Sequence, residues 1–408
     1  MPHTLHQPLP PDLAPAEVAA RLRHLPGLVF FDSAQENPSS LSLIAANPRE
    51  TVTGSTAADW ALLREKVGAA QKADAMDRGL PNGFAAGIVN YDGSFWFGFY
   101  GDALIYRHGD QSWHAAGGDL AKQMRETADR PIASAPHFST DVTCGDFCKM
   151  VRRAQDYIAA GDIYQVNLSH QFTAPWQGDP WQFHQALRLC SPAPHSAFLD
   201  LDGRSVLSTS PELFLQMSGR QIRTRPIKGT RPRRAQSAAD RKSAYDLVTS
   251  PKEMAELLMI TDLERNDLGK ICEYGSIKVM ELNKLERFEQ VFHLVSTVEG
   301  RLRAEMDHVS ALQSCFPGGS ITGAPKKRAC EIIAELEPVP RGLYTGAIGY
   351  FGFNGESQFS IAIRTVLIGD GIARFHVGAG IVADSVGAEE YQETLDKAAG
   401  ILLAASRL

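Results

Sequence analysis

The sequence predicts an α+β fold, and two observations support that expectation. Strand-like segments follow one another directly, as in residues 83–118, where Gly and Asp separate stretches rich in aromatic and β-branched residues. Helical segments lie between groups of strands instead of alternating with every strand. Both features favour antiparallel sheets with helices over a doubly wound parallel sheet. No repeat of fixed period is present, so a solenoid is not expected.

The N-terminal part begins with a Pro-rich, irregular lead-in. Short buried strands are then predicted at 28–33 and 41–47, followed by a helix over 57–76 that places Trp60, Leu63 and Val67 on one face. The β-meander of 83–118 comes next. Residues 126–140 show neither the helical nor the strand period, and we expect a linker there.

The remaining chain alternates between helices and groups of strands. Helices are predicted at 144–160, 181–190, 252–272, 326–337 and 388–405, the fourth ending before Pro338. Strands are predicted at 162–174, 196–201, 204–210, 212–219, 288–302, 344–353, 358–370 and 372–382.

Composition is that of a soluble globular protein, with 44% hydrophobic and 22% charged residues. The net charge of -6 disfavours nucleic-acid binding, which normally requires a basic surface. Six scattered cysteines complete no zinc set, so we expect buried, reduced thiols. The N-terminus lacks a signal-peptide pattern, and no apolar run approaches the ~18 residues of a membrane span. These features predict a cytoplasmic protein without a membrane partner.

Two glycine-rich segments resemble nucleotide-binding motifs only in part. "GAGIVA" matches a dinucleotide fingerprint at Gly378, Gly380 and Ala383, but a loop follows it where that fingerprint requires a helix. "PGGSITGAPKK" lacks the Gly-Lys-Ser/Thr end of a phosphate loop. Its backbone N–H groups and the helix beginning near Pro325 could still bind an anion, a carboxylate as readily as a phosphate.

The basic stretch "RTRPIKGTRPRR", residues 223–234, raises three alternatives: a nucleic-acid patch, a solvated loop or part of an active site. Nucleic-acid loops usually contain aromatic residues for stacking, and this one has none. Lys228 lies between Ile227 and Gly229, a setting typical of a held side chain. Neighbouring positive charges would disfavour its protonated form, as a nucleophilic lysine requires.

Two helices carry acids that can be solvated or functional. Glu256 lies on a largely apolar helix, where a buried carboxylate needs a partner or a metal. Glu390, Glu393 and Lys397 share one face of the last helix, which can also be an ordinary solvated face. Carboxylates from two helices with open coordination positions would suit Mg²⁺.

Taken together, the motifs resemble those of the chorismate-utilising enzymes. They are "SPELF", "RPIKGTRPR", "ELLMITDLERNDLG", "FHLVSTVEG", "PGGSITGAPKKRA", "YTGAIGY", "IAIRTV", "GAGIVADS" and "EEYQETLDKA", and they occur in the family order over about residues 145–405. The resemblance implies a large α+β sandwich of two antiparallel sheets covered by helices, with the active site between the sheets. It also implies a shortened N-terminal region over 1–140 and a chorismate-binding catalytic domain over 141–408.

Two positions discriminate between members of the family. The resemblance associates Pro-Ile-Lys-Gly-Thr, which contains Lys228 here, with aminodeoxychorismate synthases, and Pro-Ile-Ala-Gly-Thr with anthranilate synthases. Gln165 stands where isochorismate and salicylate synthases have a water-activating lysine, so addition of water is not expected. The implied reaction is amination of chorismate at C4 to 4-amino-4-deoxychorismate, a precursor of p-aminobenzoate and folate.

The resemblance also assigns roles to single residues. Glu212 matches the family's general acid, Lys228 its nucleophile and His293 an active-site histidine, although a core histidine is the alternative. Glu256 and Glu390 are expected to hold Mg²⁺, and Glu393 a metal-bound water. Arg364 and Tyr344 match contacts to the enolpyruvyl carboxylate. The remaining substrate-binding positions are Gln165, Ser320, Gly378, Gly380 and Lys397.

The ammonia source is not visible in this sequence. No Gly-x-Cys-x-Gly nucleophile elbow occurs, so a separate glutamine amidotransferase subunit is the expected partner. Two alternatives remain open. One is anthranilate synthase component I, which belongs to the same family. The other is a non-catalytic anion-binding protein on the same fold, which would not need an acid and a nucleophile.

Overall fold

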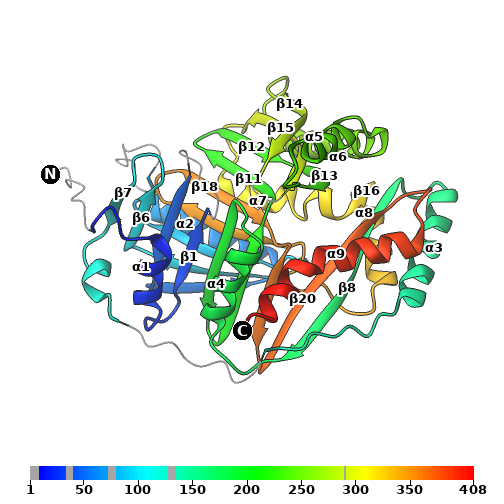
Figure 1. Ribbon diagram of the computed structural model, residues 1–408. Helices are drawn as coiled ribbons and strands as arrows, with labels where there is room; N and C mark the ends of the chain where they lie inside the picture. The colour runs from blue at the N-terminus through cyan, green and yellow to red at the C-terminus, as the bar shows by residue number, and fades with distance from the viewer. Residues whose placement is uncertain (1–8, 34–39, 72–79, 127–134, 289–290) are drawn as a thin grey trace.

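Two antiparallel sheets pack face to face, and helices cover their outer faces (Figure 1). The computed structural model describes residues 9–33, 40–71, 80–126, 135–288 and 291–408. Between the sheets lies an apolar layer to which both contribute, with Val29 and Leu199 from one sheet and Ile88 and Ile348 from the other. The predicted α+β sandwich is confirmed.

In the described residues each sheet has ten strands. The first contains, in spatial order, β16 (Gly323–Ala324), β8 (Gln165–Pro175), β20 (Ile372–Ile381), β19 (Thr365–Gly369), β10 (Arg204–Ser210), β9 (His195–Leu201), β1 (Val29–Asp32), β2 (Leu41–Ala45), β6 (Ala103–Arg107) and β7 (Ser112–Ala116). The second contains β13 (Ile227–Pro232), β15 (Val291–Arg301), β12 (Gln221–Arg225), β11 (Leu213–Ser218), β18 (Glu356–Ile361), β17 (Ala347–Gly352), β4 (Phe84–Val89), β5 (Phe95–Tyr100) and β3 (Glu50–Gly54), with β14 (Lys278–Arg287) paired to β15.

The helices of the described residues are α1 (Pro15–Leu22), α2 (Ala57–Ala70), α3 (Cys144–Ala159), α4 (Pro180–Cys190), α5 (Ser237–Val248), α6 (Pro251–Gly269), α7 (His308–Cys315), α8 (Lys326–Leu336) and α9 (Gly387–Ala405). Helix α6 packs against β13 and β15, and α9 packs against β20. Helix α6 begins at Pro251, and the Ser250 hydroxyl accepts a hydrogen bond from the backbone N–H of Glu253. These two helices face the functional site from opposite sheets.

The described residues before 140 do not form a separate layer. Strand β1 pairs with β9 over Val29–Asp32, and β4 pairs with β17 over Phe84–Val89, so this region extends both sheets. In Figure 1 its strands occupy the end of the sandwich opposite β8 and β20. The sheets therefore continue across the boundary expected at residue 140, and 127–134 of the expected linker lie outside the described residues.

Two local predictions need correction. The expected strand 358–370 is two strands in different sheets, because the chain crosses between sheets at 362–364, where Arg364 adopts a φ of 49°. The basic stretch is not a loop but belongs to β12 and β13, both paired with β15. Strands β3 and β14 and helices α5 and α7 were not predicted, since their sequences lack a clear apolar period.

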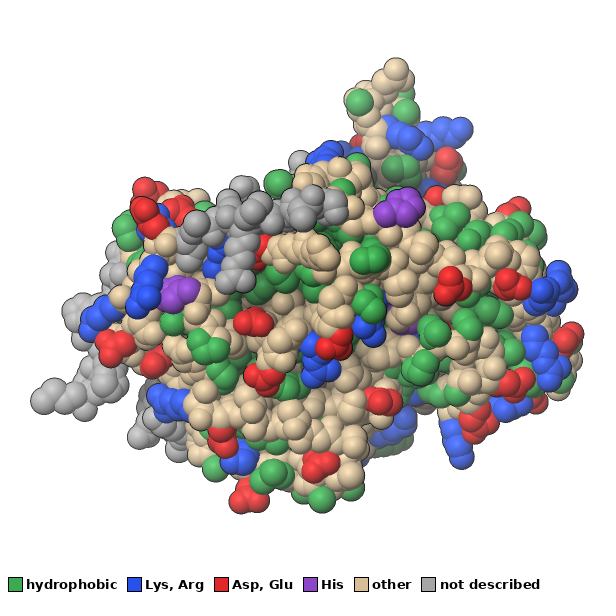
Figure 2. Space-filling model, turned by 90° about the horizontal axis from the view of Figure 1, so that it is seen from below, with side chains coloured by type: hydrophobic (Ala, Val, Ile, Leu, Met, Phe, Trp, Pro, Cys, Tyr) green, Lys and Arg blue, Asp and Glu red, His purple; other side chains and the backbone are tan. Residues whose placement is uncertain are grey.

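All six cysteines are free, but only Cys272 and Cys315 are buried, so burial of every thiol was an overstatement. Acidic and basic side chains are interspersed on the face shown in Figure 2, with no basic stripe across it. Among the described residues, no helix is both long and apolar enough to cross a bilayer.

Candidate active site

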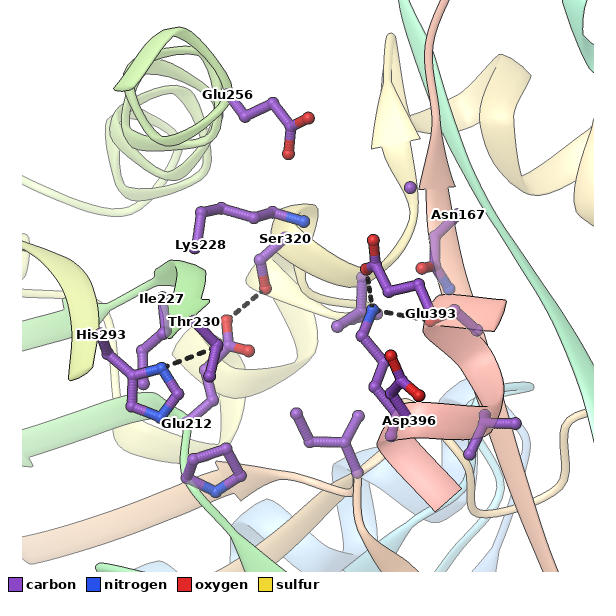
Figure 3. A pocket seen from close by; sticks show the side chains of 18 of the residues that line it. Asn167, Glu212, Ile227, Lys228, Thr230, Glu256, His293, Ser320, Glu393 and Asp396 are labelled. Atoms are coloured by element: carbon purple, nitrogen blue, oxygen red, sulfur yellow. Dashed lines mark hydrogen bonds and ion pairs between the residues drawn. The ribbon is translucent and has the colours of Figure 1, made fainter. Parts of the chain in front are cut away.

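A cavity of about 810 Å³ opens between β13 and α6 on one side and β20 and α9 on the other (Figure 3). Twelve of the thirteen predicted site residues line it: Glu212, Lys228, Glu256, His293, Ser320, Tyr344, Arg364, Gly378, Gly380, Glu390, Glu393 and Lys397. They come from segments separated by up to 185 positions in the sequence, from Glu212 to Lys397. The fold thus brings together residues that the sequence could group only by family resemblance.

Lys228 projects into the cavity from a bulge in β13. The register against β15 shifts between Lys228 and Thr230, at Gly229, whose φ is 67°. A Cβ at Gly229 would lie 2.8 Å from Leu247 Cδ1, so this position requires glycine. Such bulges redirect neighbouring side chains. Lys228 Nζ forms no hydrogen bond or ion pair with the described residues, and Figure 3 shows it directed toward the same space as Glu256 and Glu393.

Most of the arginines in the basic stretch around Lys228 have acidic partners of their own. Four of its five arginines form ion pairs, namely Arg223 with Glu299, Arg225 with Glu286, Arg231 with Glu253 and Arg233 with Asp240. The charged groups that interact with Lys228 are Glu212, Glu256 and Glu393. Lys228 thus lies among acids as well as beside the arginines of its own strand and of β12.

Glu212 is a buried acid with a defined hydrogen-bond donor. Glu212 lies in the short connection between β10 and β11, and only 6% of the residue is exposed. The Ser320 hydroxyl donates a hydrogen bond of 2.6 Å to Glu212 Oε1. Burial raises the pKa of Glu212, while Ser320 and Lys228 oppose the rise. Removal from water thus favours the protonated form, the state that a general acid needs.

His293 lies on β15 and is 2% exposed. Its Nδ1 is 2.9 Å from the Thr230 hydroxyl, which follows Lys228 by two positions. Burial, and to a lesser degree the positive charge of Arg364, lower the pKa of His293 to about 4. The imidazole is therefore neutral at pH 7 and can exchange hydrogen bonds without carrying charge.

Arg364 provides an unpaired cation for an anionic ligand. Its guanidinium has no carboxylate partner among the described residues, and burial lowers its pKa. Tyr344 lines the same cavity and stacks on His376, with 5.3 Å between ring centroids. A planar guanidinium suits bidentate binding of a carboxylate. This part of the cavity can therefore bind a carboxylate group.

Two glycines of β20 allow close approach of polar side chains. A Cβ at Gly378 would lie 2.8 Å from the Tyr344 hydroxyl, and one at Gly380 would lie 2.4 Å from Gln165 Nε2. Lys397 Nζ donates to the Gly378 carbonyl at 2.9 Å and pairs with Glu393 Oε1 at 2.7 Å. A larger residue at Gly378 would displace the Tyr344 hydroxyl, and one at Gly380 would displace the Gln165 amide.

The sequence of the chain matches that of a known protein family. Residues 29–403 match the family of chorismate binding enzymes. The chain belongs to this family. The match includes most of both sheets and all the residues described above.

Curated relatives of this chorismate binding enzyme carry two names. It is 50% identical over 257 residues to aminodeoxychorismate synthase component 1 of Klebsiella aerogenes, covering 63% of this chain and 57% of that protein. It is 44% identical over 297 residues to anthranilate synthase component 1 3 of Haloarcula marismortui, covering 71% and 59%. The alignments thus span somewhat more than half the length of these relatives.

Solved structures agree with the fold. Anthranilate synthase component I from Streptococcus pneumoniae aligns with a TM-score of 0.78 at 29% identity, covering 90% of this chain and 93% of that chain. The menaquinone-specific isochorismate synthase MenF from Escherichia coli aligns with a TM-score of 0.78 at 16% identity, covering 95% of this chain and 91% of that chain. The second likeness concerns the fold alone.

The acids of this chorismate binding enzyme were tested for their fit to a metal. Burial raises the pKa of Glu256 and of Glu390, and neither forms an ion pair within 4.0 Å in the described residues. Ser385 donates to Glu390 Oε1 at 2.8 Å. Within the described ranges no cluster of three or more His, Cys, Asp or Glu side chains could hold a metal by itself. The donor set fits Mg²⁺ held by two carboxylates and completed by water and substrate oxygens.

Glu393 differs from these two acids. Burial would raise its pKa, but Lys397 and Lys228 lower it overall, so Glu393 is held as a carboxylate. Both Glu393 and Lys397 are already engaged with each other in this arrangement. Their predicted contacts to a metal-bound water and to substrate would require this ion pair to be shared or opened.

Gln165 is the predicted residue that does not line the cavity. It is 2% exposed, its Nε2 would lie 2.4 Å from a Cβ at Gly380, and its Oε1 has no hydrogen-bond partner among the described residues. The cavity includes several residues that were not predicted: Asn167, Thr230, Lys252, Glu253, His376 and Asp396. Strand periodicity could have identified His376, because it stands two positions before Gly378 on β20.

Proposed function

We propose that this chorismate binding enzyme is aminodeoxychorismate synthase component 1, which aminates chorismate at C4. The observation that carries the proposal is Lys228, which has no ion-pair partner among the described residues and lines the same cavity as Glu212 and Arg364. The family resemblance associates a lysine at this position with amination at C4. The relative from Klebsiella aerogenes, named aminodeoxychorismate synthase component 1, supports the same assignment.

Chorismate would bind through its two carboxylates. Arg364 and Tyr344 would bind the enolpyruvyl carboxylate, since the guanidinium of Arg364 has no carboxylate partner in the part of the chain that the structure describes. Glu256 and Glu390 would hold Mg²⁺, which when bound neutralises the ring carboxylate and withdraws electron density from the conjugated ring. This arrangement would place the C4 hydroxyl toward Glu212.

The first chemical step would form a covalent bond to Lys228. The neutral amine of Lys228 attacks C2, both conjugated double bonds of the ring shift, from C1=C2 and C5=C6 to C1=C6 and C4=C5, and the C4–O bond breaks. Glu212 gives its proton to the departing oxygen, which leaves as water. The proton lost by the alkylated lysine nitrogen restores Glu212 to its acid form over the cycle.

The second step would release the product. Ammonia attacks C4, both ring double bonds shift back to C5=C6 and C1=C2, and the bond between C2 and Lys228 breaks. The proton lost from the new C4 ammonium balances the proton taken up by the lysine nitrogen. The net change replaces the hydroxyl with an amino group and leaves the enolpyruvyl ether intact, as in 4-amino-4-deoxychorismate.

A glutamine amidotransferase subunit would supply the ammonia. The designation component 1 of the relatives is consistent with a second subunit. The purified chain should therefore use high ammonium at alkaline pH, where ammonia is available, and should not use glutamine. Glutamine hydrolysis by the chain alone would contradict this assignment of the partner.

Anthranilate synthase component 1 is the second candidate, because relatives with that name are 44% identical to the chain. Product analysis separates the two. The chain is incubated with chorismate, Mg²⁺ and ammonium salt, with and without aminodeoxychorismate lyase. We expect p-aminobenzoate only when the lyase is present. Fluorescent anthranilate formed without lyase would assign the second function.

A further inference from the structure

We propose that Glu264 is a positioning residue for Glu212, acting through the backbone amides of Gly319 and Ser320. This inference rests on the proposed role of Glu212 as the catalytic acid. Glu264 lies on α6 outside the cavity, so it would not touch chorismate. It would act by fixing the hydroxyl that binds Glu212.

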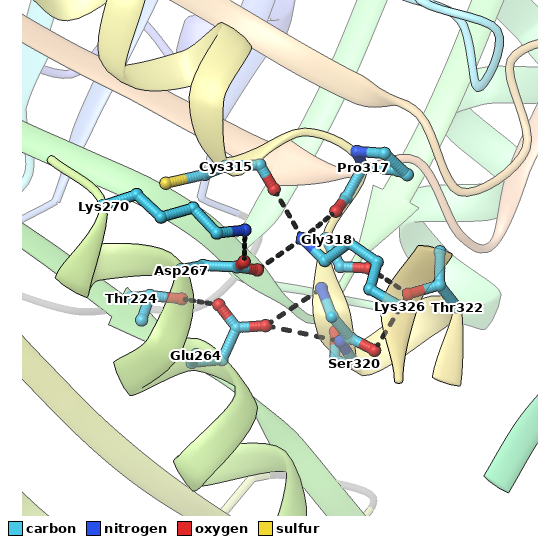
Figure 4. Close-up of polar contacts among 11 residues, drawn as sticks. Thr224, Glu264, Asp267, Lys270, Cys315, Pro317, Gly318, Ser320, Thr322 and Lys326 are labelled. Carbon is cyan, nitrogen blue, oxygen red and sulfur yellow. Dashed lines mark hydrogen bonds and ion pairs between the residues drawn. The ribbon is translucent and has the colours of Figure 1, made fainter. Parts of the chain in front are cut away.

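A short series of contacts connects the two acids. Glu264 Oε1 accepts hydrogen bonds from the N–H groups of Gly319 at 3.2 Å and Ser320 at 3.3 Å (Figure 4). The hydroxyl of the same Ser320 donates to Glu212 Oε1 at 2.6 Å. The other oxygen of Glu264 is 3.4 Å from the Thr224 hydroxyl. A shift of the Gly319–Ser320 backbone would therefore move the donor away from Glu212.

The preceding residues are anchored by a neighbouring ion pair. Lys326 pairs with Asp267, one turn after Glu264 on α6. Lys326 also donates to the carbonyls of Cys315 at 2.9 Å and Pro317 at 2.6 Å. Asp267 and Lys326 thus fix the residues before Gly319. Glu264 holds the backbone that follows, at Gly319 and Ser320.

Glycine at 319 permits this close contact. A Cβ at Gly319 would lie 2.7 Å from Leu263 Cδ2 and 3.1 Å from Glu264 Oε1. Two backbone N–H groups of the glycine-rich segment are therefore directed at a carboxyl group of the same protein, that of Glu264.

A carboxyl at this position is costly for folding. Glu264 is 3% exposed, and burial, with Asp267 adding to it, raises its pKa to about 7. The charged groups around it are Asp267, Lys326 and Glu212. Apolar residues often replace buried charged groups without loss of stability. The carboxyl is thus better explained by the two amides it binds than by the stability of the core.

Two substitutions separate positioning from packing. Glu264→Gln retains an oxygen that can accept from both amides, whereas Glu264→Leu retains similar bulk without an acceptor. We expect Glu264→Gln to keep kcat for ammonia-dependent amination within roughly threefold of the wild type. We expect Glu264→Leu to lower kcat about 10–100-fold, as loss of a supporting contact commonly does. Thermal unfolding should show no matching loss of stability.

A double-mutant cycle tests the route through Ser320. Ser320→Ala removes the hydroxyl, so adding Glu264→Leu to it should lower kcat by less than threefold further. If kcat of the double variant fell by the product of the two single losses, the substitutions would act independently and the proposal would be overturned. Equal kcat values for Glu264→Leu and the wild type would also overturn it. Asp32→Asn, which removes a buried carboxylate outside the cavity, should leave kcat unchanged.

Crystal structures of the variants give a readout that needs no turnover. The hydrogen bond between Ser320 and Glu212 should persist in Glu264→Gln and be lost in Glu264→Leu. Its persistence in both variants would refute the positioning role. If the wild type formed no aminated product, the proposed function would fail, while this structural comparison would still decide the role of Glu264.

Discussion

Replacing Lys228 should separate its role as nucleophile from its role as a positive charge. Lys228→Ala removes both, whereas Lys228→Arg keeps a cation that stays protonated and cannot attack carbon. Lys228 lowers the pKa of Glu212 and of Glu256 against the larger effect of burial, so Lys228→Ala should protonate both acids more fully. Lys228→Arg should largely preserve their ionisation. If the covalent step is essential, both variants lose amination equally.

We expect kcat with ammonia to fall roughly 10²–10⁴-fold in both variants, the range that a positioned catalytic group commonly provides. Rates are measured with chorismate, Mg²⁺ and saturating ammonium, with aminodeoxychorismate lyase added in excess. Chorismate binding, measured by calorimetry, should persist because Arg364 and Tyr344 remain. Lys242→Ala, on the exposed surface of α5, is the control and should be fully active. Near-normal turnover by Lys228→Arg would refute the nucleophilic role and leave an electrostatic one.

Three further predictions concern the metal, the substrate and the fold. Glu256→Gln or Glu390→Gln should abolish turnover in a folded protein, and excess EDTA should do so reversibly; full activity in EDTA would exclude the Mg²⁺ assignment. Arg364→Ala should raise KM for chorismate at least about tenfold through loss of a charged hydrogen bond, and an unchanged KM would place the carboxylate elsewhere. His170 is buried, and desolvation lowers its pKa to about 4, below the 6.5 of an exposed histidine, so its neutral form stabilises the fold above pH 6.5. That contribution, on the order of 3 kcal/mol, should be lost as the pH falls to about 4, and denaturant titrations of His170→Gln should show a weaker pH dependence.

The fold class followed from the sequence because local patterns encode it. The long amphipathic patterns of α6 and α9 and the hairpins of 83–118 predicted helices and antiparallel strands that the structure contains. The change of sheet at Arg364 was not predictable from these patterns. The β-branched and apolar residues of 358–370 predict one strand, whereas the positive φ of Arg364 depends on the tertiary arrangement.

The site was predictable only in part. Motif resemblance grouped Lys228, Glu212 and Glu256, but spacing alone cannot place residues from different strands and helices in one cavity. Charge patterning did not reveal how the arginines near Lys228 are paired, because two of their acidic partners, Glu286 and Glu299, come from distant segments. Glu264 could not be recognised either, since its partners, the amides of Gly319 and Ser320, carry no side-chain signal in the sequence.

The most direct test of the account is whether chorismate bonds to Lys228. The protein is incubated with chorismate and Mg²⁺ in the absence of ammonia, quenched, and analysed by mass spectrometry before and after proteolysis. We predict a mass increase equal to chorismate minus water on the peptide that carries Lys228, lost again when ammonium is added before quenching. Absence of this adduct under every condition, in a preparation that aminates chorismate, would contradict the covalent route.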